Sequence, residues 1–237
     1  MVTSHEATQV RDGHDATEVV NVPRPGVKYT VEAIGTFFLV FTVGAAVGSS
    51  STLAPLGIGA VLMVMIYAGA HISGGHYNPA VTLAVLVRRR IGLRDAVGYW
   101  TVQFGAGLLG AVAVREIIDP ARVAATAALT LSGHALLAAF AVELVFTFAL
   151  CYVVLNVATS RHHADNSYYG LAIGFTVAAG AIAVGSISGG AFNPSIALGA
   201  AVMGVFAWPT LWVYMVAQVI GGLAAGVTFL ALNPDDK

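Results

Sequence analysis

The chain has 237 residues, of which 57% are hydrophobic and only 10% are charged. Soluble domains carry about 25% charged residues, so this composition excludes an ordinary soluble domain. The formal net charge of −1 gives no reason to expect a nucleic-acid partner. The single cysteine, Cys151, lies in an apolar run without a disulfide partner, and we interpret it as a small buried hydrophobe.

Residues 1–27 are polar and carry charges of both signs. They lack the apolar core of a secretory signal, so we predict a disordered cytoplasmic tail. His5 and His14 lie in this tail without a surrounding ligand cluster, which argues against a metal role.

Long uncharged stretches dominate the rest of the chain, and a helix needs about 20 apolar residues to cross a bilayer. We predict six membrane-spanning helices, at residues 28–48, 54–72, 96–116, 134–158, 167–186 and 208–231. Two apolar segments, 78–88 and 193–204, are too short to cross, and each begins at Asn-Pro. Because proline fits the first turn of a helix, each predicts a half-helix that starts inside the membrane.

The basic residues predict the orientation of these spans. With six spans, both ends of the chain lie on one side, together with nine basic residues: Arg11, Arg24, Lys28, Arg88, Arg89, Arg90, Arg94, Arg161 and Lys237. Only Arg115 and Arg122 lie on the other side. This asymmetry predicts cytoplasmic termini, and contact with lipid headgroups explains the Arg88–Arg90 run.

The chain repeats itself at an offset of 115 residues. Ser73-Gly74-Gly75 recurs as Ser188-Gly189-Gly190, and Asn78-Pro79 recurs as Asn193-Pro194. We therefore expect a single domain, 28–231, built from repeats 28–118 and 134–231 and followed by a short tail, 232–237. Three spans per repeat is an odd number, so the two repeats lie upside down relative to each other, a plan that points to a site at the membrane midplane.

The two half-helices predict a barrier to charge. Each N-terminus carries a partial positive charge of roughly half an elementary charge. Two such ends that face each other at the midplane oppose cations and protons. Asn78 and Asn193 lie at these ends as N-caps, and their amides can also face a lumen.

Two segments resemble the signature loops of the aquaporin and glycerol-facilitator family: Ser73-Gly-Gly-His-Tyr-Asn-Pro-Ala-Val-Thr82 and Ser188-Gly-Gly-Ala-Phe-Asn-Pro-Ser195. The segment Glu32–Phe41 is similar to the family's first span. The resemblance implies an all-α membrane fold of six helices and two half-helices, a homotetramer with one pore per subunit, and no cofactor. The pore motifs it implies are Asn78, Pro79 and Ala80, and Asn193, Pro194 and Ser195.

Glu32 and Glu143 are acids well inside spans, where a carboxylate is a functional hypothesis by default. They form either a proton-relay pair of a coupled transporter or a support for the irregular loop of each repeat, and the resemblance favours support. His71 and His76 flank the first loop and are expected to be hydrogen-bonded scaffold. His162 and His163 lie in a loop where a pH switch is conceivable, although a solvated loop is the simpler interpretation.

The resemblance carries the family's selectivity ring onto Ile58, Ala181, Gly190 and Ile196. Water-selective members place an aromatic residue and an arginine in this ring, whereas here Ile196 replaces the arginine and Ser195 replaces the alanine of the second motif. Without a guanidinium, the pore loses a fixed positive charge and its donors. The apolar ring allows either a broad pore for small neutral solutes or a poor water conductor that dewets. Arg115 or Arg122 remains available to replace the charge.

The sequence thus favours a passive channel of relaxed selectivity for water and small neutral solutes, in a bacterial inner membrane. A pore for glycerol or gases, a proton-coupled transporter and a structural junction protein remain as alternatives. An enzyme is not expected, because no metal cluster, activated nucleophile or phosphate loop is present in the sequence. Glycines in the third and sixth spans are interpreted as helix-packing sites: Gly105, Gly107, Gly110, Gly221, Gly222 and Gly226.

Overall fold

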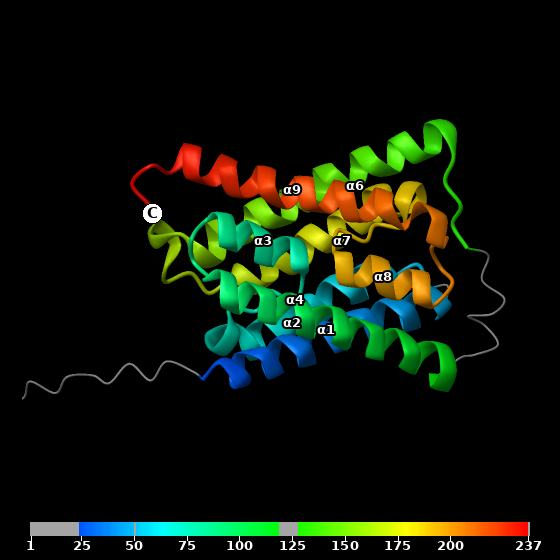
Figure 1. Cartoon of the computed structure of the whole chain (residues 1–237), viewed down its shortest axis with the longest axis horizontal. Coiled ribbons are helices and arrows are strands. Elements are labelled where there is room, and N and C mark those ends of the chain that lie inside the picture. The colour runs from blue at the N-terminus through cyan, green and yellow to red at the C-terminus, as the bar shows by residue number, and fades with distance from the viewer. Residues whose placement is uncertain (1–23, 50, 119–127, 237) are drawn as a thin grey trace, which may run out of the picture.

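The computed structural model describes residues 24–49, 51–118 and 128–236 (Figure 1). In this part of the chain, six helices are long and apolar enough to cross a membrane. They are α1 (Pro25–Ser49), α2 (Ala54–Ser73), α4 (Leu93–Ala113), α6 (Gly133–Val154), α7 (Tyr169–Ser188) and α9 (Leu211–Leu232). The half-helices α3 (Pro79–Val87) and α8 (Pro194–Val202) have nine residues each. The predicted all-α fold is therefore confirmed.

Short irregular turns extend three of the spans. The π-helical turns η1 (Val114–Ile118) and η2 (Leu155–Thr159) continue α4 and α6, and the 3-10 turn η4 (Trp208–Thr210) precedes α9. A further 3-10 turn, η3 (Arg161–His163), lies between α6 and α7. The spans begin and end within a few residues of the ranges that hydropathy predicts, because the apolar runs themselves set their length.

The two repeats pack in the same way. In the first, α1 contacts α2 and α4, and in the second, α6 contacts α7 and α9. Each half-helix also packs against the last helix of the other repeat, α3 against α9 and α8 against α4. Figure 1 shows α3 and α8 following each other between α9 on one side and α4 on the other. The interior of the bundle is thus filled by short helices, whose ends meet near its centre.

Small residues allow these close approaches. A side chain at Gly222 of α9 would meet the carbonyl oxygen of Ala80 at 2.7 Å, which explains how α3 lies directly against α9. Packing contacts confirm the interpretation of the other predicted glycines except Gly105, where nothing lies within 4 Å. Gly105 is on an exposed face of α4, so the packing prediction was wrong there.

The arginine run also departs from expectation. Arg88 is completely buried, and its guanidinium lies over the ring of Phe229 at 4.4 Å from the centroid. The prediction that lipid contact explains the whole run is therefore wrong for Arg88. The reason is that residues beyond α9 fold back over this end of the bundle, where Asp236 pairs with Arg88 at 2.7 Å.

Candidate functional site: the pore at the two Asn-Pro motifs

Asn78 and Asn193 begin the half-helices and also bind the two loops to each other. The Asn78 side-chain oxygen accepts from the backbone of Ala80 at 2.8 Å, and that of Asn193 accepts from Ser195 at 2.9 Å. Each amide nitrogen donates across the pseudo-symmetry axis, Asn78 to Phe192 O and Asn193 to Tyr77 O, both at 2.9 Å. Each side-chain amide has a second N–H, which takes no part in this cross-link.

Both asparagines follow a residue in the left-handed backbone region, Tyr77 with φ 48° and Phe192 with φ 50°. This conformation is strained for a bulky residue and persists only where the surroundings fix it. The Tyr77 hydroxyl donates to Met65 O at 2.9 Å, and both rings are buried. The aromatic side chains thus anchor loops whose backbone leaves the helical geometry.

The Glu32 carboxylate accepts hydrogen bonds from the first loop and its neighbours. Its Oε1 accepts from Ser73 Oγ at 2.7 Å and from the His76 N–H at 2.9 Å. Its Oε2 accepts from the Tyr77 N–H at 2.7 Å and from Gln103 Nε2 at 2.9 Å. The carboxylate is completely buried, so these four bonds replace the water that it has lost.

Glu143 does the same for the second loop. Its Oε1 accepts from Ser188 Oγ at 2.7 Å and from the Ala191 N–H at 3.0 Å. Its Oε2 accepts from the Phe192 N–H and from Gln218 Nε2, both at 2.9 Å. The geometry of the two carboxylates is therefore the same, contact by contact, in the two repeats.

The repeats differ where polar residues of the first are alanines in the second. In the first, His76 Nδ1 lies 3.0 Å from Thr82 Oγ1, which in turn accepts from Gln103 Nε2 at 3.0 Å. The corresponding residues of the second repeat are Ala191 and Ala197. As a result, Gln218 Oε1 is buried without a hydrogen-bond partner. Comparison of the two repeats in the sequence could have identified this difference, because Ala197 stands at the place of Thr82. It was not predicted from the sequence.

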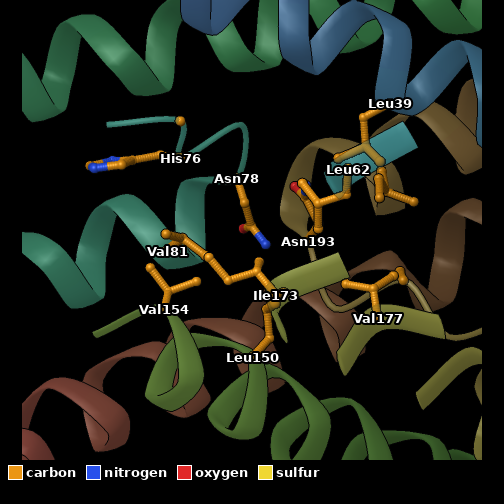
Figure 2. A pocket seen from close by; sticks show the side chains of 13 residues that line it. Leu39, Leu62, His76, Asn78, Val81, Leu150, Val154, Ile173, Val177 and Asn193 are labelled. Atoms are coloured by element: carbon orange, nitrogen blue, oxygen red, sulfur yellow. The ribbon is translucent and has the colours of Figure 1, made fainter. Parts of the chain in front are cut away.

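A narrow cavity runs past the two asparagines. Its volume is about 10 Å³, which is about the room that the centre of one water molecule needs. Figure 2 shows Asn78, Asn193 and His76 at this cavity among branched aliphatic side chains. These apolar residues occupy corresponding places in the two repeats: Leu39 with Leu150, Leu62 with Val177, and Val81 with Ile196. Apart from Ile196, they were not predicted as pore residues.

Ile196 is the one predicted ring residue that lines this cavity; it is 5% exposed. Gly190 and Ala181 are neighbours, since a side chain at Gly190 would lie 3.3 Å from Ala181 Cα. The φ of +65° at Gly190 also disfavours any larger residue there. Ile58 is half-buried and packs against the core.

The remaining predicted residues lie away from the two asparagines. Arg115 donates to Val202 O at 2.9 Å and pairs with Glu116, so in the described contacts it caps the C-terminus of α8. Arg122 lies outside the described residues. His71 and His163 line one pocket of about 250 Å³ beside the turn between α6 and α7, and His162 is exposed. Cys151 is buried and free, as predicted.

Six apolar spans, two half-helices joined by asparagine amides, and a water-sized cavity between them define a membrane channel rather than an enzyme. The sequence model for the major intrinsic protein family matches residues 27–229, and the chain belongs to this family. Members of the family are passive channels, and this chain is an integral membrane channel for water or glycerol-type small solutes.

Individual proteins agree with this assignment. The chain is 36% identical over 217 residues to "Glycerol uptake facilitator protein-like 6" of Lactiplantibacillus plantarum, covering 88% of this chain and 99% of the relative. It is also 36% identical over 220 residues to "Aquaporin NIP2-1" of Oryza sativa subsp. japonica, covering 88% and 71%. The solved structure of the aquaglyceroporin from Plasmodium falciparum superimposes with a TM-score of 0.73 at 22% identity, covering 87% of this chain and 96% of that one, and thus shares the fold.

Proposed function

We propose that the chain is a pore of relaxed selectivity, which passes small neutral solutes such as glycerol together with water. The observation that carries this proposal is Ile196, an aliphatic side chain that lines the cavity beside Asn193. An arginine here would present five donors and a permanent charge to the lumen. Ile196 presents neither, so solutes larger than water meet less discrimination.

Helix geometry supports a common level for the four ring residues. Ile58 lies four residues before Leu62 on α2, and Ala181 lies four residues after Val177 on α7. Residues four apart share a helix face, and both Leu62 and Val177 line the cavity. The repeat mate of Ile58 is Ile173, which also lines the cavity. These relations favour a ring at the end of the cavity where Ile196 lies, with Ile58 and Ala181 one helical turn beyond Leu62 and Val177 and with Gly190 beside Ala181.

Exclusion of protons then depends on the midplane. The N-termini of α3 and α8 both point at the cavity, and each adds a partial positive charge that opposes cations. The free N–H of each asparagine amide can orient a passing water, so that neighbouring waters do not form a continuous proton wire. The ring itself adds no charge to this barrier.

A second candidate is a pore for glycerol or dissolved gases that conducts water poorly. The aliphatic lining favours it, because an apolar constriction can lose its water and close to it. The name of the Lactiplantibacillus plantarum relative, "Glycerol uptake facilitator protein-like 6", agrees with glycerol as a solute. The two candidates differ only in the rate at which water passes.

A proton-coupled transporter finds less support in the two buried carboxylates. Each oxygen of Glu32 and Glu143 already accepts two hydrogen bonds from its own loop or a neighbouring glutamine. Protonation would break one of these contacts and weaken the loop. We therefore propose that Glu32, Glu143 and His76 support the pore loops and carry no transported proton.

The assembly and topology belong to the same proposal. We infer a homotetramer with one pore per subunit, no cofactor, and a bacterial inner-membrane location with both termini cytoplasmic. The expected domain limits remain residues 28–231, with repeats 28–118 and 134–231 between a tail at 1–27 and one at 232–237. The excess of arginine and lysine on the side of Arg88 and Arg161 supports this orientation.

Stopped-flow light scattering on proteoliposomes tests the proposal, with water and glycerol measured in one preparation. We expect fast shrinkage after a sorbitol step and fast re-swelling after a glycerol step, both insensitive to an imposed proton gradient. Slow shrinkage with fast glycerol flux would select the second candidate. Uptake that follows the proton gradient would refute a passive pore, and no gain over empty liposomes would refute the proposal altogether.

A further inference from the structure

Asp236 has a completely buried side chain although it lies four residues beyond the end of α9. Its Oδ1 accepts from Arg88 Nη2 at 2.7 Å, from Arg90 Nη2 at 3.2 Å and from Arg161 Nε at 3.2 Å. Its Oδ2 accepts from the backbone N–H of Arg161 at 3.0 Å. The Arg161 guanidinium also donates to the carbonyl of Asp235. One carboxylate therefore holds three guanidinium groups together.

This carboxylate stays charged. Burial works to raise the pKa of Asp236, but the hydrogen bonds from Ser160, from the backbone of Arg161 and from Arg88 outweigh burial and hold the pKa below its ordinary value of 3.8. Hydrogen bonds between charged groups are the stronger ones, and several converge here. The cluster is consequently an ion-pair network at neutral pH.

The partners of Asp236 come from separate elements of the fold. Arg88 and Arg90 follow the C-terminus of α3, and Arg161 begins η3 in the turn between α6 and α7. Arg88 is fixed further by Phe229 of α9 and donates weakly to Thr159 O at 3.4 Å. Asp236 thereby ties the turn to α3 and α9 across the end of the bundle, beside the C label in Figure 1.

The turn that Asp236 holds also forms a wall of the pore mouth. Val154, Ala158 and Thr159 line an open pocket of about 430 Å³ that reaches His76. Val154 and Ala158 also line the pocket of about 250 Å³ that reaches Gly75. Both His76 and Gly75 line the narrow cavity, so the two pockets form one mouth, to which Lys28 and Arg90 contribute positive charge.

The turn needs such an anchor because its own geometry is irregular. It starts with the π-helical residues Leu155–Thr159, and π-helical turns are rare and often found at functional sites. Its only helix of its own is the three-residue η3, whose side chains are exposed. The start of this segment is anchored in the core by Leu155, with Val157 packed against it. Its later residues are held by Asp236 and by Asn166, whose amide donates to Val157 O at 2.7 Å.

We propose that Asp236 is a positioning residue of the channel, which keeps the pore mouth open by holding the turn between α6 and α7 against the end of α3. With the network formed, both pockets of the mouth are open. Without the carboxylate, Arg88 is a buried charge without a counter-ion, a state that destabilises its surroundings strongly. The turn then moves into the pockets, and solutes no longer reach His76 freely. This inference rests on the channel activity but not on the selectivity ring.

The test compares Asp236→Asn with Asp236→Glu and with Asp235→Asn in proteoliposomes, at equal amounts of reconstituted protein. Asp235→Asn removes the same charge one residue away and serves as the matched control. We expect Asp236→Asn to lower the water and glycerol permeabilities together, by about threefold, with their ratio unchanged. Asp236→Glu is expected to restore most of the loss, and Asp235→Asn to match the unaltered chain.

Hydrogen exchange of the full chain in nanodiscs distinguishes positioning from general stability. Amides of residues 155–163 are expected to exchange faster in Asp236→Asn, while those of α3 and α8 stay protected. Unchanged permeability in folded Asp236→Asn would overturn the proposal, as would equal losses in Asp235→Asn. If Asp236→Asn does not fold, Arg161→Gln replaces it in the test, because this variant keeps the backbone hydrogen bond to Asp236. A partial loss of permeability in Arg161→Gln would support the proposal, and unaltered permeability would overturn it. A changed glycerol-to-water ratio alone would concern the ring and would likewise contradict this role.

Discussion

At the scale of single residues, the proposed selectivity depends on Ile196 and Gly190. Ile196 contributes an aliphatic side chain to the cavity, and Gly190 contributes no side chain next to Ala181. Polar contacts near the asparagines come from the amides of Asn78 and Asn193 and from backbone groups of the two loops. A neutral solute thus meets a largely apolar passage with few fixed donors.

Replacement of Ile196 by arginine is expected to narrow the pore and restore a fixed positive charge. We expect glycerol permeability to fall roughly tenfold further than water permeability, because a guanidinium both fills space and binds water. Ile196→Leu conserves volume and serves as the control, with a glycerol-to-water ratio like that of the unaltered chain. An unchanged ratio in Ile196→Arg, measured by stopped-flow light scattering, would remove Ile196 from the ring.

At the scale of elements, the half-helices are held by the partner repeat as well as by their own caps. The carbonyl oxygen of Ala80 lies so close to α9 that a Cβ at Gly222 would meet it at 2.7 Å. The cross-repeat bonds of Asn78 and Asn193 add a second connection at the same depth. The position of the lumen amides therefore depends on helix packing some distance from them.

Gly222→Ala tests this dependence. Alanine normally stabilises a helix relative to glycine, yet at this position we expect a loss of about 1–3 kcal/mol, because α3 must shift away from α9. Gly105→Ala on α4 is the matched control, since nothing lies within 4 Å of that Cβ, and it is expected to be neutral or stabilising. Thermal unfolding in detergent measures both variants. Equal effects would show that the close contact is not a constraint.

The Asp236 network also predicts a pH response at this scale. The pKa of Asp236 is held below 3.8, so its contribution is complete above that value and is lost as the pH falls below it. The arginines do not titrate in this range. We therefore expect constant permeability from about pH 8 to about pH 5, because the pH stays above the ordinary pKa of an aspartate carboxyl over this whole range. A step in permeability within this pH range would contradict the role given to Asp236.

At the scale of the whole molecule, the sequence predicts the parts that the repeat encodes twice. Two Asn-Pro motifs at one offset, with apolar runs of bilayer length around them, determine the half-helices and the six spans. The Asp236 network could not be predicted in this way. It joins one aspartate of a short polar tail to Arg88 and Arg161, residues far apart in sequence and without a repeat mate of the same kind. The burial of Arg88 depends on this tertiary contact, which hydropathy does not report.

Topology is a further whole-molecule prediction. In a Cys151→Ser background, we expect cysteines introduced at Thr3 and at Asp235 to resist a membrane-impermeant maleimide in intact spheroplasts, because the proposed orientation has both termini in the cytoplasm. A cysteine at Ala125, between the third and fourth spans, is expected to react. Labelling of either terminus from outside would contradict this orientation and place the mouth beside Asp236 on the outer side.

The central claim is a pore whose ring admits more than water, and the reflection coefficient of glycerol tests it most directly. Proteoliposomes are subjected to equal osmotic steps of glycerol and of sorbitol, and the initial shrinkage rates are compared. The account predicts a reflection coefficient for glycerol clearly below that of sorbitol, since glycerol enters with the water through a ring without an arginine. Equal coefficients together with fast water flow would contradict it, and would mean that the pore is a narrow water filter in spite of Ile196.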